Sequence, residues 1–328
     1  MVEEPPRRGS RGEHCRHRWG GLRHRFSWGG CSRARACHAD GLVESLGRAR
    51  HRAGVAMTIL DTLNEAQRIV GHYWKEEQSP EQARILGCAR DALSFICSTG
   101  QPYRFEDYRK RLQAENPSRE RSPSGTDRVP AMHEPSRDLA AEGFFERSRD
   151  ELRSEPERAL ALVIIDALRF IASTGQLDDF NRYLQELDSN EPPRVVASFD
   201  TREQAETWLK NHPSPPHCAS ILIAGRYHTV AYDRETNGRY LPPSRDLEYY
   251  LVSLKQDSPP TATASFDTRQ EAEAWLRAQS APPRRTWALI SGELYLAVYH
   301  PNVNHRALYP LSMADGFEIN TEVEPEST

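Results

Sequence analysis

The densest group of side chains able to bind a metal is a short proline-rich stretch near the middle of the chain. His212, His217 and Cys218 lie close together there, and imidazole and thiolate are ligands that zinc prefers. A second copy of the surrounding sequence, 67 residues later, has Gln279 and Arg284 where this copy has its two histidines. Because no ligand recurs and no fourth ligand is evident, we interpret the stretch as a loop and predict no metal and no cofactor.

Paired carboxylates are a second kind of candidate for chemistry. Asp200 and Glu203 lie three residues apart, and Asp267 and Gln270 repeat the spacing in the copy. Two carboxylates can act as an acid–base pair, but the same spacing is typical of a helix start, with Asp as the N-cap and the later residue completing a capping box. Capping explains both the residue types and their spacing, so we predict helix caps at Asp200 and Asp267.

Motifs that would indicate an enzyme do not occur in the sequence: GxSxG, HExxH, the phosphate loop and the dinucleotide-binding glycine pattern. His228 and His300 lie beside expected strands, with no Ser or Cys arranged for either. We therefore predict no catalytic residue and a protein that is not an enzyme. The alternative is an enzyme with an unrecognised site between two duplicated units, joining non-repeated residues such as His217, His228 and His300.

Recurring arginines and tyrosines are the remaining candidates for recognition. These arginines are either paired surface charges or anchors for an acidic partner, and we favour paired charges. Tyrosines on a sheet can form a binding face or fill the core, and the recurrence of Tyr232 as Tyr299 favours the core. We assign a candidate interaction surface to Tyr240, Tyr249, Arg202, Arg239, Arg269 and Arg306.

Two duplications supply the elements that position these side chains, and the first is helical. Residues 91–101 match residues 166–176 at nine of eleven positions. In each copy, apolar residues at helical spacing lead into Ser-Thr-Gly-Gln, where Gly100 or Gly175 suits a left-handed helix end. We interpret this recurring sequence as a helix stop and not as a site.

The sequence also predicts where these helices start. Ser79 at the cap, followed by Pro80 and by Gln82 at the third helical position, predicts a helix start, and Ser154 opens the looser counterpart. A preceding helix is expected at 58–77, with a weaker counterpart at 137–152. A short helix should follow each Ser-Thr-Gly-Gln.

The second duplication mixes strands and helices. Residues 197–209 match residues 264–276 at ten of thirteen positions. Each copy reads as strand, helix, strand, strand, with Gly225 or Gly292 in the turn between the last two strands. A further helix is expected at 245–254. A module of 67 residues buries little surface alone, so we expect the two units to pack together or to pair with another chain.

Charge and composition exclude several functions. Residues 57–328 carry 31 basic and 42 acidic residues, which argues against nucleic-acid binding by this part. No apolar run approaches the roughly 18–20 residues that a membrane helix needs, so we expect no membrane contact. The six cysteines show no paired or CxxC spacing in the part that follows residue 56. We therefore expect a reducing compartment, the cytoplasm.

The first 56 residues form a segment of a different kind. They contain twelve Arg and no Lys and lack apolar periodicity, which is typical of disorder. Three interpretations stay open: an arm for an acidic partner, a targeting segment, or a start codon assigned too early with Met57 opening the protein. We favour the last. A zinc site is disfavoured because the spacing of its cysteines matches no finger pattern; these are Cys15, Cys31 and Cys37.

The predicted fold class is α+β, with a duplicated helical region followed by two tandem β-α-β-β units. The predicted divisions are a disordered segment at 1–56, helical unit 1 at 57–113, a linker at 114–136, helical unit 2 at 137–190, β-α-β-β unit 1 at 194–256, β-α-β-β unit 2 at 261–318 and an acidic tail at 319–328.

The element Phe-Asp-Thr-Arg-Glu-Gln-Ala-Glu-Thr-Trp-Leu at 199–209, followed by a Gly-Tyr hairpin, resembles an uncharacterised bacterial repeat family. The helical Ser-Thr-Gly-Gln unit accompanies that element in the family, and some members carry a "phage head protein" label. The element is also loosely similar to sporulation-related repeats that bind peptidoglycan, although the chain lacks the secretion signal that such a role needs.

The predicted function is a non-enzymatic protein-interaction or structural repeat protein. Small duplicated modules offer repeated surfaces and need no catalytic apparatus. The expected partner is another protein or a second copy of the chain, and the family resemblance adds a phage-related origin as a special case.

Overall fold

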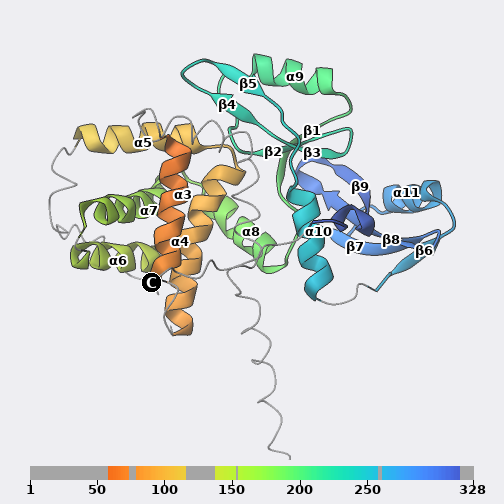
Figure 1. Cartoon of the computed structure of the whole chain (residues 1–328), viewed down its shortest axis with the longest axis horizontal. Coiled ribbons are helices and arrows are strands. Elements are labelled where there is room, and N and C mark those ends of the chain that lie inside the picture. Colours follow the sequence, from red (N-terminus) through yellow and green to blue (C-terminus); the bar gives the residue numbers. More distant parts are fainter. Residues whose placement is uncertain (1–57, 74–78, 116–136, 153, 258–260, 318–328) are drawn as a thin grey trace, which may run out of the picture.

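The computed structural model describes residues 58–73, 79–115, 137–152, 154–257 and 261–317. Helices gather on one side of the molecule and two β-containing units on the other (Figure 1). The predicted α+β class is confirmed. The predictions for the N-terminal segment, for the greater part of the 114–136 linker and for the acidic tail lie outside the described residues.

Two three-helix repeats make up the helical side. The first helical repeat comprises α3 (Ile59–Tyr73), α4 (Pro80–Ser98) and α5 (Pro102–Glu115). The second helical repeat comprises α6 (Arg137–Glu151), α7 (Glu155–Ser173) and α8 (Leu177–Asp188). The last two residues of α5 extend into the segment predicted as linker.

The two helical repeats contact each other through equivalent residues. Gln101 Nε2 donates to Oε1 of Gln176, its counterpart, at 2.6 Å. Ring contacts between the repeats also come in exchanged pairs, in which each aromatic of one repeat meets the partner position of the other. These pairs are Phe95–Phe180 with Phe105–Phe170, and Phe95–Tyr183 with Tyr108–Phe170. The pattern is that of an approximate two-fold axis, with one apolar core between the repeats.

The ends of the central helices follow the predicted local rules. Ser79 caps α4 by accepting from the backbone N–H of Gln82, whose side chain returns a bond to the cap. Ser154 stands at the equivalent place before α7 but makes no such side-chain bond within the described part of the chain. Gly100 and Gly175 end the helices with φ of 73° and 70°, the left-handed conformation that glycine adopts without strain.

The β side consists of two units with related topology. The first β unit contains β1 (Val195–Phe199), α9 (Arg202–Asn211), β2 (Ser220–Ile223), β3 (Arg226–Thr229), β4 (Ala231–Asp233), β5 (Gly238–Tyr240) and α10 (Asp246–Asp257). The second β unit contains β6 (Ala264–Phe266), α11 (Arg269–Ala278), β7 (Arg285–Ile290), β8 (Glu293–His300), η1 (Pro301–Val303), β9 (His305–Pro310) and η2 (Leu311–Ala314).

In both β units the first strand pairs in parallel with the second, and the second pairs antiparallel with the third. The predicted order strand, helix, strand, strand is present, but each unit has a further strand. β9 extends the sheet of the second unit, while β5 pairs with β4 in a separate ribbon of the first. The turns before β3 and β8 have positive φ at two successive residues, Ala224 with Gly225 and Ser291 with Gly292, as in a type I′ hairpin.

The predicted helix caps at Asp200 and Asp267 are wrong by one residue. Thr201 caps α9, its hydroxyl accepting from the backbone N–H of Gln204, and the Gln204 side chain accepts from the Thr201 backbone. Thr268 caps α11 in the same way. Asp and Thr are both good caps and both have an acidic or amide residue three positions later, so the chain satisfies the rule twice. In both helices the threonine is the residue that caps.

The two β units pack against each other, as expected for modules of this size. α10, predicted at 245–254, follows the first sheet and covers both units (Figure 1). Its buried residues Leu247, Tyr250, Leu251 and Leu254 share one apolar cluster with residues of both sheets. The sheet residues of the cluster include Leu222, Leu296, Val298 and Tyr309.

Among the described residues, no single helix is long and apolar enough to cross a membrane. One bent pair, α7 with α8, passes by length and composition alone.

Candidate functional site

The recurring Arg239 and Arg306 each bind the C-terminal end of the helix in their own β unit. Arg239 Nη1 donates to the carbonyls of Lys210 at 2.8 Å and His212 at 2.9 Å, at the C-terminal end of α9. Its guanidinium also lies over the ring of Tyr232, 5.5 Å from the centroid. Arg306 repeats the arrangement with a carbonyl at the end of α11 and the ring of Tyr299. Cations are favourable at a helix C-terminus, so both arginines stabilise the fold.

Arg202 and Arg269 are also held by contacts within their own unit. Each pairs with a glutamate one helical turn later and donates to a backbone carbonyl of the following strand region. The partners are Glu206 with Leu241, and Glu273 with Leu308. These contacts agree with the prediction that the recurring arginines are paired charges. The alternative, that they anchor an acidic partner, stays open.

The two tyrosines of the predicted interaction surface have different surroundings. Tyr240 on β5 is 64% exposed. Tyr249 on α10 packs edge-on against Phe317, with the ring centroids 5.8 Å apart. The six predicted residues are therefore spread over both β units and face different elements.

The proline-rich stretch holds the first β unit against the first helical repeat. His217 is buried and its ring stacks on that of Tyr103, with centroids 5.2 Å apart. Its Nδ1 accepts a hydrogen bond from the backbone N–H of Tyr232 at 3.0 Å. Burial lowers the pKa of His217 to about 4, which keeps the imidazole neutral. No group of three or more His, Cys, Asp or Glu in the described chain is placed to hold a metal.

We call this contact the first junction, made by Gly100, Tyr103 and Asp107 on the helical side with Pro216, His217, Tyr232 and Arg234 on the β side. Tyr103 Oη donates to the backbone carbonyl of Tyr232 at 2.9 Å. Arg234 forms two hydrogen bonds to the Asp107 carboxylate, at 2.6 and 2.7 Å. The Arg234 guanidinium holds the pKa of Asp107 below its usual value. Aromatic packing and a two-point ion pair therefore close the first junction.

The equivalent positions of the second copies line an open pocket. Asp107, His217, Tyr232 and Arg234 correspond to Arg182, Arg284, Tyr299 and Pro301. These four residues line a pocket of about 340 Å³ between α8 and the second β unit, which we call the second junction. A Cβ added at Gly100 would lie 2.2 Å from Cβ of Pro216, whereas one added at Gly175 meets no described atom within 4 Å.

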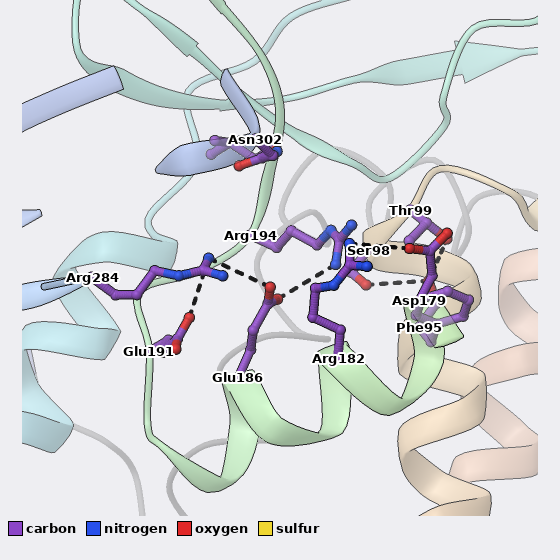
Figure 2. Close-up of polar contacts among 11 residues, drawn as sticks. Phe95, Ser98, Thr99, Asp179, Arg182, Glu186, Glu191, Arg194, Arg284 and Asn302 are labelled. Carbon is purple, nitrogen blue, oxygen red and sulfur yellow. Dashed lines mark hydrogen bonds and ion pairs between the residues drawn. The ribbon is translucent and has the colours of Figure 1, made fainter. Parts of the chain in front are cut away.

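Charged side chains dominate the second junction, as Figure 2 shows with Glu186 lying between two arginines above α8. Arg194 approaches Glu186 at 3.4 Å, and Arg284 approaches Glu186 at 3.5 Å and Glu191 at 3.3 Å. Burial raises the pKa of Glu191. These separations are longer than the 2.6 and 2.7 Å between Arg234 and Asp107, so the two carboxylates hold the guanidinium groups loosely.

Sequence reasoning missed the second junction because it searched for what recurs. The informative signal was the opposite one: His217 becomes Arg284 and Asp107 becomes Arg182 inside otherwise similar copies. Planar guanidinium groups bind carboxylate and phosphate through two parallel hydrogen bonds. The arrangement is suited to binding an anion.

The three histidines of the enzymatic alternative each contact a different partner. His217 faces the first helical repeat, His228 Nδ1 contacts the carbonyl of Arg226 at 3.1 Å, and His300 Nε2 contacts Tyr227 Oη at 2.9 Å. A pair that the sequence did not predict joins the two β units: Ser198 Oγ lies 3.0 Å from Nδ1 of His305.

The cysteines of the helical core have the role expected of small apolar residues. Cys88 is buried and Cys97 packs against the same cluster, where burial raises the pKa of Cys97 to about 12. Its thiol is therefore protonated and a poor nucleophile.

Comparison of the chain with protein-family models, with curated proteins and with solved structures finds no match.

Proposed function

We propose that the chain is a non-enzymatic protein-interaction or structural repeat protein. One observation carries the proposal: the Ser-Thr-Gly-Gln turn of the first helical repeat packs against a β unit of the same chain, while residues 172–175 of the equivalent turn in the second repeat are exposed. We call residues 97–101 the first corner and residues 172–176 the second corner.

The two corners have the same internal structure. Thr99 Oγ1 donates to the carbonyl of Phe95 and Thr174 Oγ1 to that of Phe170, both at 2.6 Å. In each corner the glutamine side chain donates back to the threonine hydroxyl. A conformation that packs against Pro216 in one repeat is therefore preformed in the other, and preformed surfaces bind with a smaller entropic cost.

The surroundings of the two corners differ in exposure. Residues 97–100 are half-buried and Gln101 is buried, whereas residues 172–175 are exposed. The helix after the second corner opens with exposed Asp178 and Asp179, where the first repeat has Tyr103 and Arg104. Acidic side chains favour a partner with basic groups at its contact surface.

The partner in this proposal is another protein or a second copy of the chain. A phage-related structural role, suggested by the resemblance of residues 199–209, is the special case in which copies assemble. The cytoplasm is the proposed location, since the cysteine spacing of the sequence favours a reducing compartment.

Site-specific photo-crosslinking tests the proposal. A benzoylphenylalanine at Ser173, in the second corner, should give a discrete adduct with one protein or with a second copy of the chain. The matched control is Ser280, an exposed serine that follows α11. Native mass spectrometry of the full chain distinguishes self-assembly from binding of a different protein. Equal or absent crosslinking at the two positions contradicts the proposal.

A further inference from the structure

We infer that the second junction is a binding site for a small oxyanion, a ligand that carries a phosphate or carboxylate group. The inference goes beyond the proposed function, because it concerns a pocket and not the exposed second corner. It rests on three observations: the arginines that line the pocket, the loose pairing of those arginines, and the different use of the same positions in the first junction.

Three elements bring the guanidinium groups together. Arg182 comes from α8, Arg194 from the segment before β1, and Arg284 from the residue before β7. Two carboxylates, Glu186 and Glu191, line the same pocket. The third acid near these arginines, Asp179, pairs with Arg182 from outside the pocket lining, and its side chain is more than half exposed. Solvent weakens that pair, so the arginines still attract an entering anion.

The carboxylates occupy the arginines only weakly. Glu186 is shared between Arg194 and Arg284 at 3.4 and 3.5 Å, whereas charge-assisted hydrogen bonds are typically about 2.7–2.9 Å long. Arg182 is paired with Asp179 at 3.3 Å, and both side chains are more than half exposed. A ligand oxyanion can therefore bind these guanidinium groups at short distance without breaking a strong internal pair.

In the first junction, side chains at the equivalent positions fill the space between the helical repeat and the β unit. There, His217 and Tyr232 pack on Tyr103, and Arg234 closes the contact on Asp107. In the second junction the position of His217 holds Arg284 and that of Asp107 holds Arg182, which places two cations where the first junction has a neutral ring and an anion. Like charges repel, so the substitutions favour a space that an anion fills.

The size of the pocket limits the ligand. A volume of about 340 Å³ is at the small end of the range for small-molecule sites, which is about 300–1,000 Å³. The half-buried Tyr299 and the buried His300 form one wall. His300 contributes no charge there because burial lowers its pKa to about 3. A compact metabolite-sized anion fits this space.

Calorimetric titration of the full chain with inorganic phosphate and with citrate, at constant ionic strength set by chloride, tests the inference. Arg284→Gln should weaken binding at least about tenfold, the effect of losing a charged hydrogen bond. Arg182→Gln should weaken it about threefold or more, because this arginine is more exposed. Arg68→Gln is the matched control: Arg68 also pairs at 3.3 Å with an acid three residues away, and it lies on α3.

Glu186→Gln separates a binding site from a structural cluster. Removing the carboxylate that competes for Arg194 and Arg284 should strengthen anion binding several-fold, whereas a purely structural ion cluster would gain no affinity for phosphate. Circular dichroism checks that each variant is folded. If Arg284→Gln does not fold, Arg182→Gln still tests the site.

Binding of phosphate alone assigns a phosphoryl ligand, and binding of citrate alone assigns a polycarboxylate. The inference is overturned if neither anion binds, if the pocket variants respond like Arg68→Gln, or if Glu186→Gln lowers affinity. Crosslinking at Ser173 is independent of these outcomes, so either idea can fail without the other.

Discussion

The two junctions use equivalent positions of the duplicated sequences but differ in the residues that meet there. The first junction is closed by stacked rings and a two-point ion pair, and the second is an open pocket of loosely paired charges. Residues that stayed identical, such as Arg239 and Arg306, cap helices and fill space within their units. Identical residues such as these two arginines make equivalent contacts inside their units, whereas residues that differ between the copies give the two junctions different contacts.

The largest expected difference between the junctions comes from their glycines. Gly100→Ala places a Cβ 2.2 Å from Pro216 at a φ of 73°, so backbone strain and overpacking should together lower the free energy of unfolding by about 3–4 kcal/mol. Gly175→Ala keeps the strain without the clash, at a φ of 70°, and should cost about 1 kcal/mol. Denaturant unfolding measures both values, and equal losses would contradict the closed packing of the first junction.

Acid should destabilise the fold through His217 in the first junction. Because the folded-state pKa of His217 is about 4 and an unfolded histidine has a pKa of about 6.5, the unfolded chain takes up the proton first as the pH falls. The stabilisation is complete above about pH 6.5 and is lost towards pH 4. Arg284, at the equivalent position, does not titrate in this range.

His217→Gln measures this contribution, because a glutamine oxygen can still accept from the Tyr232 backbone. Between pH 7.5 and pH 5 the natural chain should lose about 2 kcal/mol more stability than the variant. The buried His300 titrates in both proteins, so its share cancels in the difference. Parallel curves of unfolding free energy against pH for the two proteins would show that His217 is not buried as a neutral group.

Local rules predicted much of the fold, and tertiary placement decided the rest. Ser79 and Gly100 could be assigned because caps and left-handed ends depend on a few neighbouring residues. The cap at Thr201 was placed one residue early because two overlapping capping patterns satisfy the same rule. The strand β5 was missed because it has three residues, and β9 was missed because its six residues show no alternation of buried and exposed positions. The pocket was beyond prediction because it requires knowing that α8 faces the residues around Arg284.

The smallest effect concerns the ion pair that closes the first junction. Asp107 and Arg234 are each nearly half exposed, so solvent weakens their attraction despite short, two-point geometry. A double-mutant cycle with Asp107→Asn and Arg234→Gln should give a coupling energy of about 0.5–1 kcal/mol, decreasing as salt is added. The corresponding cycle for Asp179 and Arg182, a longer and more exposed pair, should give about 0.3 kcal/mol or less. A larger coupling in the second pair would mean that Arg182 is committed to Asp179 and is not available to a ligand, which would weaken both the comparison and the anion site.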